Sequence, residues 1–239
     1  FPDMLLGAGT VLTTEQADRA IAAGAKFIVS PGFNPKVVSH CIEKNIPITP
    51  GISSPSDMEQ AIEMGLDAVK FFPAVPSGGL SMIKALAAPY HTMRFMPTGG
   101  VTPQNLTEFL DYPKILACGG TWMVKPELLA TGNFEEITRL TRQTVRTMLD
   151  LKIDELTLPF PHTGNNLSDA LHGLINLSSG STKELTISCR YLKRTIYHLE
   201  KNGATFRYDN AKYDSAGNMN AIDFSDAPED FSIRLIEKH

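Results

Sequence analysis

Residues 1–150 repeat one pattern six times: a short apolar run ends in a Gly/Pro or small polar cluster, and an amphipathic stretch follows. Strands that alternate with helices at this spacing are typical of βαβ units and predict a parallel sheet. The runs are continuously apolar, which indicates strands covered on both faces. We expect strands at Met4–Gly9, Lys26–Ser30, Ile46–Pro50, Ala68–Phe72, Arg94–Pro97 and Ile115–Cys118.

Three of the amphipathic stretches carry helix-start signals. Thr13 to Gln16 resembles a capping sequence, Pro55 follows Ser54, and Thr102-Pro103 opens a later stretch. Six strand–helix units are visible, whereas a closed (β/α)8 barrel needs eight. Two interpretations follow: an open doubly wound sheet, or a TIM barrel whose first two βα units are absent from this chain.

The pattern changes near residue 150, and residues 151–239 are expected to form a small α+β domain. Ile153–Leu158 resembles Thr182–Ile187, which indicates an internal repeat, and Asp214–Asn218 reads as a turn. We expect strands at Ile153–Phe160, Glu184–Cys189, Ala204–Tyr208, Asn220–Phe224 and Phe231–Ile236, helices at Leu167–Leu177 and Tyr191–Lys201, and a linker at Ser178–Ser181.

Composition narrows the classes of function. A formal net charge of −4 over 239 residues argues against a nucleic-acid or membrane-surface protein. No apolar run approaches the roughly 20 residues that span a bilayer, and no secretory signal is visible. Three distant cysteines without metal-ligand spacing favour a reducing cytoplasm. The six histidines form no ligand spacing either.

Lys70 lies inside the apolar run Ala68–Phe72. A buried charge is costly unless it is paired or neutralised, and a desolvated lysine can lose its proton. A neutral amine can attack a ketone and form a Schiff base. The alternative is a lysine at a strand edge whose ammonium group reaches water.

Two glycine pairs, Gly99-Gly100 and Gly119-Gly120, follow the last two predicted strands. Because glycine has no side chain, its backbone N–H group can approach an anion closely, and the N-termini of the helices that follow would add favourable dipole ends. The pairs therefore predict a phosphate site, although each could serve only a tight turn. Thr10, after the first strand, is a candidate substrate contact or a helix cap. No Asp or Glu occupies the carboxyl end of a predicted strand, so a general base for aldol chemistry is missing from the pattern.

Six motifs in order and spacing resemble the 2-dehydro-3-deoxy-6-phosphogluconate (KDPG) / 4-hydroxy-2-oxoglutarate (KHG) aldolases. The resemblance covers roughly residues 4–148. The motifs are Gly7–Leu12, Ile28–Gly32, Ile48–Ser53, Val69–Ala74, Pro97–Val101 and Gly119–Trp122.

The resemblance implies a cytoplasmic class I aldolase of carbohydrate metabolism, a homotrimer of (β/α)8 barrels that needs no metal or other cofactor. It implies cleavage of KDPG to pyruvate and glyceraldehyde 3-phosphate, and of KHG to pyruvate and glyoxylate. Lys70 matches the Schiff-base lysine. The substrate-binding positions are Thr10, Pro31, Pro50 and Phe72, and the phosphate-binding positions are Thr98, Gly99, Gly100, Gly119, Gly120 and Thr121.

Family members carry two further βα units before the Gly-Ala-Gly-Thr motif, and these supply a catalytic glutamate and a substrate-binding arginine. Both are outside this sequence, so we expect the chain to be truncated or its numbering to omit an N-terminal portion. The tail resembles a shortened vicinal-oxygen-chelate (glyoxalase-like) module. Glu155 and Glu184 occupy plausible metal-ligand positions there, but Arg234 stands where a carboxylate is expected, and we expect no metal. The alternative function is a non-catalytic phosphate-sugar-binding scaffold or regulatory protein whose tail is the functional part.

Overall fold

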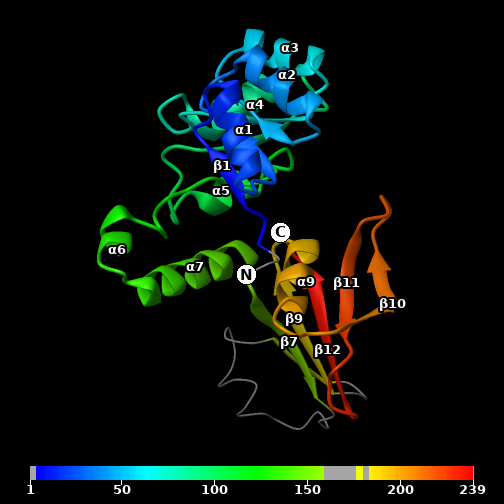
Figure 1. The fold of residues 1–239 in the computed structure, drawn as a ribbon. Coiled ribbons are helices and arrows are strands. Elements are labelled where there is room, and N and C mark those ends of the chain that lie inside the picture. Colours follow the sequence, from blue (N-terminus) through cyan, green and yellow to red (C-terminus); the bar gives the residue numbers. More distant parts are fainter. Residues whose placement is uncertain (1–3, 159–175, 180–182, 239) are drawn as a thin grey trace. The chain divides into compact units, whose positions relative to one another are not determined.

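The computed structural model describes residues 4–158, 176–179 and 183–238. They form two compact units, Phe1–Thr141 and Arg142–His239 (Figure 1). The second unit thus begins inside helix α7 (Phe134–Leu149), earlier than the boundary at residue 150 that the sequence pattern indicates. The sequence pattern did not reveal this earlier boundary, because α7 continues as one unbroken helix across it.

The first unit is built on parallel strands in chain order. The pairings run β1 to β2 to β3 in one sheet and β4 to β5 to β6 in another. The strands are β1 (Gly7–Gly9), β2 (Phe27–Val29), β3 (Ile48–Thr49), β4 (Gly51–Ile52), β5 (Ala68–Phe71) and β6 (Arg94–Pro97).

Pro50, the last residue of the predicted strand Ile46–Pro50, separates two short strands that belong to different sheets. Proline has no N–H to donate, so it interrupts a ladder. Ile48 and Thr49, before it, pair with β2, whereas Gly51 and Ile52, after it, pair with β5. The same stretch of chain therefore belongs to both sheets.

The sixth predicted strand, Ile115–Cys118, is not a regular strand. It contributes only isolated parallel bridges, Phe95 with Ile115 and Thr98 with Gly119. The helix that follows it, α6 (Pro126–Ala130), has five residues. The last predicted strand therefore runs parallel beside β6, as expected, but forms no continuous ladder with it.

Helices follow the strands, and their caps explain where they begin. The Thr13 side chain accepts from Gln16 N at the start of α1 (Thr14–Ala22). Ser54 and Asp57 form a reciprocal capping box at α3 (Pro55–Glu63). The remaining helices of this unit are α2 (Pro35–Glu43), α4 (Gly79–Ala87) and α5 (Leu106–Leu110).

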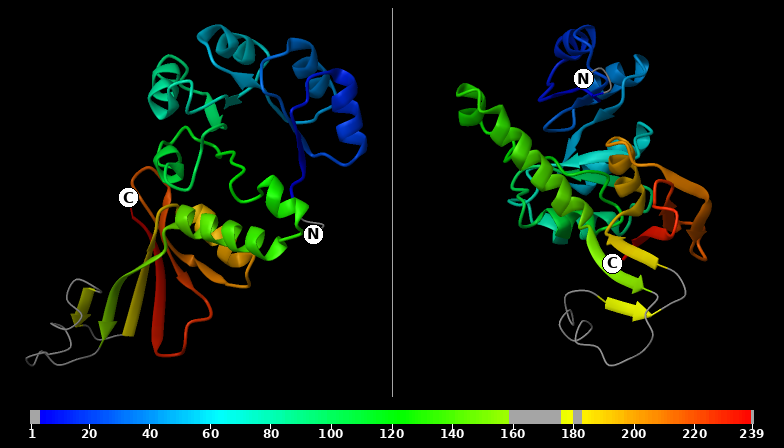
Figure 2. Two further views of the ribbon diagram at one scale, coloured as in Figure 1. Left: turned by 90° about the vertical axis from the view of Figure 1, so that its left-hand side faces the viewer. Right: turned by 90° about the horizontal axis from the view of Figure 1, so that it is seen from below.

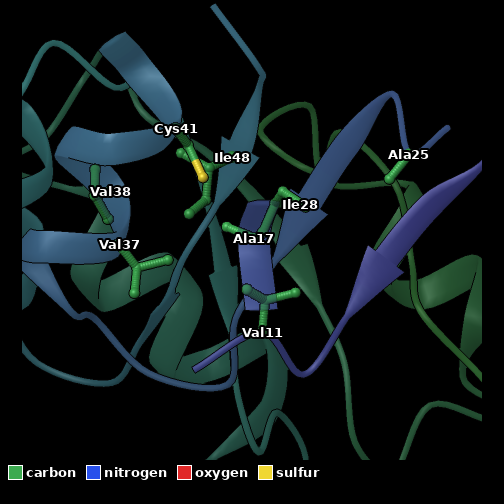
Figure 3. Packing of buried hydrophobic residues seen from close by; sticks show 8 residues of the cluster. All are labelled: Val11, Ala17, Ala25, Ile28, Val37, Val38, Cys41 and Ile48. Carbon is green, nitrogen blue, oxygen red and sulfur yellow. The ribbon is translucent and has the colours of Figure 1, made fainter. Parts of the chain in front are cut away.

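One core cluster joins the first strands to the first helices. Figure 3 shows Ala17 of α1, Ile28 of β2 and Ile48 of β3 gathered with Val38 and Cys41 of α2. Ile28, Ala17 and Cys41 are fully buried. This packing fixes the edge of the sheet from which the first loops emerge.

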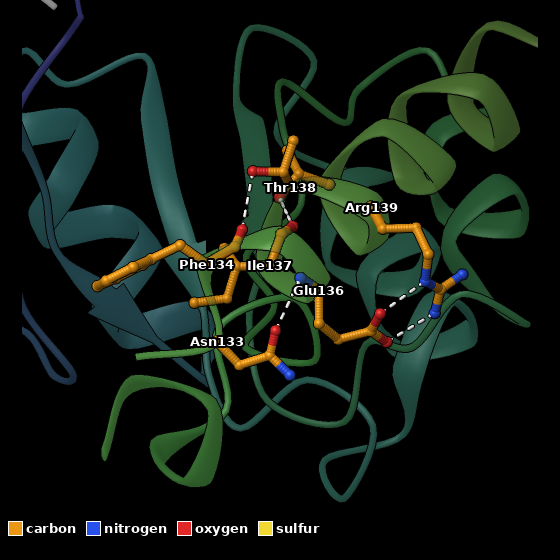
Figure 4. Close-up of polar contacts among 7 residues, drawn as sticks. Asn133, Phe134, Glu136, Ile137, Thr138 and Arg139 are labelled. Atoms are coloured by element: carbon orange, nitrogen blue, oxygen red, sulfur yellow. Dashed lines mark hydrogen bonds and ion pairs between the residues drawn. The ribbon is translucent and has the colours of Figure 1, made fainter. Parts of the chain in front are cut away.

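Local polar contacts define the start of α7. The Asn133 side chain accepts from Glu136 N at 3.2 Å, in the position of an N-cap (Figure 4). Glu136 accepts two hydrogen bonds from Arg139, each 2.7 Å long. The ion pair lowers the pKa of Glu136.

The second unit is a six-stranded sheet with the order β10-β11-β12-β9-β7-β8 (Figure 2). Helix α9 (Leu192–Glu200) packs against it through Leu192 and Ile196, which share a buried cluster with Phe206, Ile222 and Leu235. The strands are β7 (Lys152–Leu158), β8 (Asn176–Ser179), β9 (Lys183–Cys189), β10 (Phe206–Tyr213), β11 (Met219–Phe224) and β12 (Phe231–Glu237).

Two predicted elements of this unit differ. Residues 176 and 177, expected to end a helix, belong to strand β8, and Ser178 and Ser179, expected in a linker, belong to it too. The rest of the predicted helix, residues 167–175, lies outside the described residues, as do 180–182. The predicted turn at Asp214 is present, since its carboxylate accepts from the backbone N–H groups of Ala216 and Asn218.

The two similar hexapeptides lie side by side. Strand β7 pairs antiparallel with β9, and the equivalent residues Leu156 and Leu185 are register partners. Each strand has a parallel neighbour on its other side, β8 for β7 and β12 for β9. This is the arrangement that a repeat related by a two-fold axis produces. Within the described residues, no helix has the length and apolarity to cross a bilayer.

Candidate active site

Lys70 is buried in the middle of the parallel ladder. Its backbone N–H donates to Pro50 O at 2.8 Å, and its register partners are Gly51 on β4 and Met96 on β6. Only 8% of the residue is exposed. The strand-edge alternative, with the ammonium group in water, does not fit this burial.

The surroundings of the Lys70 amine favour its neutral form. Nζ lies 4.4 Å from the centroid of the Phe72 ring. Burial lowers the pKa of Lys70 below its ordinary value, because desolvation disfavours the ammonium ion. In the part of the chain that the structure describes, no carboxylate pairs with this amine. The arrangement supplies a nucleophile at a lower pH than an exposed lysine does.

The loops after β2 and β3 touch at the carboxyl edge of the sheet. A Cβ on Gly51 would lie 2.0 Å from Pro31 O and 2.8 Å from Gly32 N. Only glycine permits so close an approach of two backbones. Pro31 and Pro50, both predicted substrate contacts, are therefore brought together around Gly51.

Thr10 follows β1 directly and has a φ of 59°. This left-handed conformation is a genuine outlier for a β-branched residue. The next residue is held on both sides, because Val11 N donates to Val29 O at 3.2 Å and Val11 O accepts from the buried Ser30 hydroxyl at 2.8 Å. The Ser30 bond thus links the Thr10 turn to the loop that carries Pro31.

The loop after β6 packs on the aromatic neighbour of Lys70. Gly99 has a φ of 93°, and a Cβ on it would lie 3.3 Å from Phe72 Cε2 and from Pro73 Cα. Gly100 has a φ of 83°, and a Cβ there would lie 2.6 Å from Val75. The backbone supports the contact, since Ala74 N donates to Thr98 O at 2.8 Å and Val75 N to Gly99 O at 3.0 Å.

The second glycine pair is adjacent to the first. A Cβ on Gly119 would lie 2.6 Å from Thr98 Oγ1, and the ring of Trp122 covers Gly120. Gly119 N donates to Pro97 O at 2.9 Å, and Thr98 N donates to Phe71 O at 3.0 Å. These two N–H groups serve the sheet, which leaves Gly99, Gly100, Gly120, Thr121 and the Thr98 hydroxyl as the predicted anion contacts.

The two helices that follow the glycine pairs, whose dipoles are expected to favour this anion site, are short. Helix α5 begins at Leu106 and helix α6 at Pro126, and each has five residues. The N-cap residue of α5, Asn105, donates to Gly100 O at 3.1 Å, so the start of this helix lies beside the first glycine pair, and the dipole contribution stays a prediction. The predicted donors to the anion are the glycine backbone N–H groups and the threonine hydroxyl groups.

Sequence reasoning missed two side chains that shape these loops. Ser30 was only the end of an apolar run, and its partner Val11 is distant in sequence. Asn105 donates from Nδ2 to Gly100 O at 3.1 Å and accepts on Oδ1 from Thr102 N at 2.8 Å. An Asn soon after a Gly-Gly turn was the signal that could have revealed the second.

Among the described residues of the second unit, Glu184, a predicted metal-ligand position, lies in a cluster of ion pairs. Arg234 donates to Asp223 (Nε to Oδ1, 2.8 Å) and to Glu184 (Nη1 to Oε1, 3.0 Å), so Glu184 is committed to an ion pair. Asp223 raises the pKa of Arg234. In the described residues, no three His, Cys, Asp or Glu side chains gather as a metal site.

Comparison with protein-family models then decides the family. The model described as KDPG and KHG aldolase matches residues 1–140. The chain belongs to the KDPG/KHG aldolase family. The match ends at residue 140, so the whole second unit, which begins at Arg142, lies outside the KDPG/KHG aldolase model.

Curated members of the KDPG/KHG aldolase family are close in sequence. The 2-dehydro-3-deoxy-phosphogluconate aldolase of Treponema pallidum is 55% identical over 144 residues, which cover 60% of this chain and 69% of that protein. The KHG/KDPG aldolase of Escherichia coli is 39% identical over 144 residues, 60% of this chain and 68% of that protein. The named relatives are aldolases, which are carbon–carbon lyases.

Solved structures of KDPG aldolases share the fold. The Legionella pneumophila enzyme matches with a TM-score of 0.58 and 38% identity over 60% of this chain and 70% of that one, and it holds pyruvate as a covalent carbinolamine. The Zymomonas mobilis enzyme, solved with 3-phosphoglycerate, matches with a TM-score of 0.56 and 37% identity over 60% and 68%. The first unit therefore has the TIM-barrel-like α/β fold of this family.

Proposed function

We propose that this chain is a class I aldolase that cleaves KDPG reversibly to pyruvate and glyceraldehyde 3-phosphate, with KHG as a second substrate. The observation that carries the proposal is the buried Lys70 amine, which faces an aromatic ring and has a lowered pKa. The Legionella relative, which holds pyruvate as a carbinolamine, supports the same chemistry for this member of the family.

Lys70 acts as the nucleophile. Its neutral Nζ attacks the C2 carbonyl of the substrate and gives a carbinolamine, which loses water to become an iminium ion. Phe72 and the buried strand around Lys70 keep the amine neutral before the attack. The Thr10 turn and the Pro31 and Pro50 loops are assigned to the pyruvate end of the substrate.

The iminium ion then accepts the electrons of the C3–C4 bond. As that bond breaks, the C4 hydroxyl loses its proton and becomes the aldehyde, and pyruvate remains on Lys70 as an enamine. Protonation at C3 and hydrolysis of the imine release pyruvate and regenerate the amine. Electron flow into a covalent iminium requires neither metal nor cofactor, and we assign none.

The glycine loops are assigned to the distal phosphate. Gly100, Gly120, Thr121 and the Thr98 hydroxyl lie beside the Phe72-Pro73 turn through the contacts of Gly99 and Gly119. Binding the phosphate at a distance from the reacting bond positions C2 against Lys70. The Zymomonas structure with 3-phosphoglycerate supports a phosphorylated ligand in this family.

The proton acceptor for the C4 hydroxyl is assigned to a carboxylate on strands beyond the six that the first unit provides. In the described sheet, β1 is paired on one side only, with β2. We propose that two further βα units on this free edge complete the eight-stranded barrel and bring the base. We also propose that the protein is cytoplasmic and forms a homotrimer. Light scattering of the purified protein tests the oligomeric state.

The second unit is proposed to be a separate module that does not take part in the Schiff-base step. The glyoxalase-like modules that it resembles bind a divalent metal, but we propose no metal here, because Arg234 occupies a position where a carboxylate ligand is expected and is paired to Glu184. Imine formation that is unchanged after dialysis against EDTA supports this assignment, and loss of imine formation after chelation contradicts it.

The deciding experiment traps the imine. Wild-type protein is treated with pyruvate and borohydride, and the modified residue is found by peptide mass spectrometry. Lys70 is expected to carry the adduct, and Lys70→Met is expected to carry none. Lys84→Met is the matched control, because Lys84 also approaches an aromatic ring (5.7 Å from Tyr112) but is exposed. An adduct elsewhere, or none in folded wild-type protein, overturns the proposal.

A further inference from the structure

Asn105 spans the loop that follows the first glycine pair. Its amide nitrogen donates to Gly100 O at 3.1 Å, and its amide oxygen accepts from Thr102 N at 2.8 Å. The two bonds grip the residues on both sides of Val101, which is buried. Gly100 is thereby held at a φ of 83° against Val75.

The position of Asn105 would suit helix capping, but its side chain does not cap the helix. It is the N-cap residue of α5, and an Asn there ordinarily accepts a hydrogen bond from the second or third helical N–H. Asn133 makes that bond to Glu136 N at the start of α7, and Thr13 and Ser54 make it at α1 and α3. Asn105 makes no side-chain cap bond to its helix. Both ends of its amide serve the loop instead.

We propose that Asn105 is a positioning residue for phosphate recognition, which determines preference for phosphorylated over unphosphorylated substrates. The inference rests on the proposed function, since it takes the Gly100 backbone as part of the phosphate site. Asn105 does not contact the substrate; its bonds to Gly100 O and Thr102 N fix the Gly100–Val101 and Val101–Thr102 peptides, and with them the ψ of Gly100 in the loop that carries the Gly100 N–H. Without it, these two peptides can rotate, and the loop loses its preorganisation for the anion.

The chemistry at Lys70 does not depend on the two hydrogen bonds of Asn105, which we call the brace. The contact between the loop and the Lys70 neighbourhood passes through Gly99, whose O accepts from Val75 N and whose Cα packs on Phe72. Those interactions precede Gly100 in the chain and do not involve Asn105. The loss should therefore appear in binding of the phosphate end and leave the bond-breaking step unchanged.

The test compares two substrates in Asn105→Ala and Asn105→Asp. KDPG carries a phosphate and KHG carries none. Removing two hydrogen bonds is expected to raise KM for KDPG about tenfold, with kcat and both constants for KHG within about twofold of wild type. Asn105→Asp keeps the acceptor for Thr102 N, loses the donor to Gly100 O and adds a negative charge, so it should show the same split, and a larger one.

Asn133→Ala is the matched control, because it removes an Asn at a helix start outside the proposed site (Figure 4). It should change neither KM. Equal losses for both substrates, or an unchanged KM for KDPG in folded variants, overturn the role of Asn105. If wild-type protein cleaves neither substrate, the proposed function fails; calorimetric binding of inorganic phosphate then tests the brace alone. Weaker binding in Asn105→Ala supports the brace, and equal binding overturns it.

Discussion

The Lys70 amine lies 4.4 Å from the centroid of the Phe72 ring, and the same ring lies beside Gly99, where an added Cβ would be 3.3 Å from Cε2. One aromatic side chain thus contacts both the nucleophile and the loop of the proposed phosphate site. Because the Phe72 side chain is only partly buried, we expect it to shift when either neighbour is changed and so to affect the other one.

Phe72→Leu is expected to admit water to the Lys70 amine. Hydration stabilises the ammonium form, so the pKa of Lys70 should rise toward its ordinary value and imine formation at neutral pH should slow. The rate of pyruvate trapping by borohydride, measured from pH 6 to 10 on both proteins, checks this. An unchanged pH profile would show that the strand, and not the ring, excludes the water.

Burial of Lys70 also predicts how stability depends on pH. Its pKa is lowered in the folded state, so the unfolded chain binds the proton more tightly than the native protein does. The penalty is full below the folded pKa and disappears as pH rises through the window between the folded and unfolded values. Lys70→Met should therefore be more stable than wild type near neutral pH, and the difference in urea midpoint should shrink at higher pH. A constant difference would refute the lowered pKa.

Gly99→Ala should be more destabilising than Gly65→Ala. Both glycines have positive φ, and a left-handed alanine costs about 1–2 kcal/mol. A Cβ on Gly65 has open space, whereas one on Gly99 crowds Phe72 and Pro73 at 3.3 Å. We expect roughly 1–3 kcal/mol of additional loss at Gly99, by analogy with overpacked sites. Urea titration of the two variants measures it, and equal midpoints would mean that Phe72 yields without cost.

Arg234→Ala should destabilise the sheet of the second unit. The substitution leaves Asp223, whose side chain is 13% exposed, without its two bonds from the guanidinium, and it also unpairs Glu184. Removing one partner of a mostly buried ion pair costs about 3 kcal/mol. Lys238→Ala, which breaks an exposed pair with Asp154, is the control and should cost less than about 1 kcal/mol. Thermal unfolding distinguishes them; similar effects would mean that water replaces Arg234.

The bounds of a strand were predicted best from the sequence where the apolar run belongs to a single sheet. Arg94–Pro97 has the bounds that its apolar run indicates. The observed strand is shorter than the predicted Ile46–Pro50, because Pro50 has no N–H to donate and the chain after it pairs in the other sheet. An apolar run alone does not reveal such a change of sheet. Ile115–Cys118 has strand-like composition, but it pairs with β6 only at single positions.

At the candidate site, the sequence revealed which residue types are unusual, but it did not reveal which residues bond to one another. Lys70 was visible from sequence because a charge interrupts an apolar run, and the glycine pairs because they recur at strand ends. The Ser30 bond to Val11 was not visible, since it exists only when β1 and β2 pair. Periodicity and composition carry no information on such cross-strand side-chain bonds.

The conformation of Thr10 sets local folding stability against the substrate-binding role that we propose for this residue. Asn45 and Asp150 also have positive φ, but their side chains tolerate that region, and a glycine at residue 10 would fill it without strain. Threonine is among the worst choices for local stability at this turn, and two hydrogen bonds to its neighbour Val11 hold it there. A mutational scan scored for folding alone would therefore favour replacing this residue, whereas a scan scored for turnover should preserve its hydroxyl.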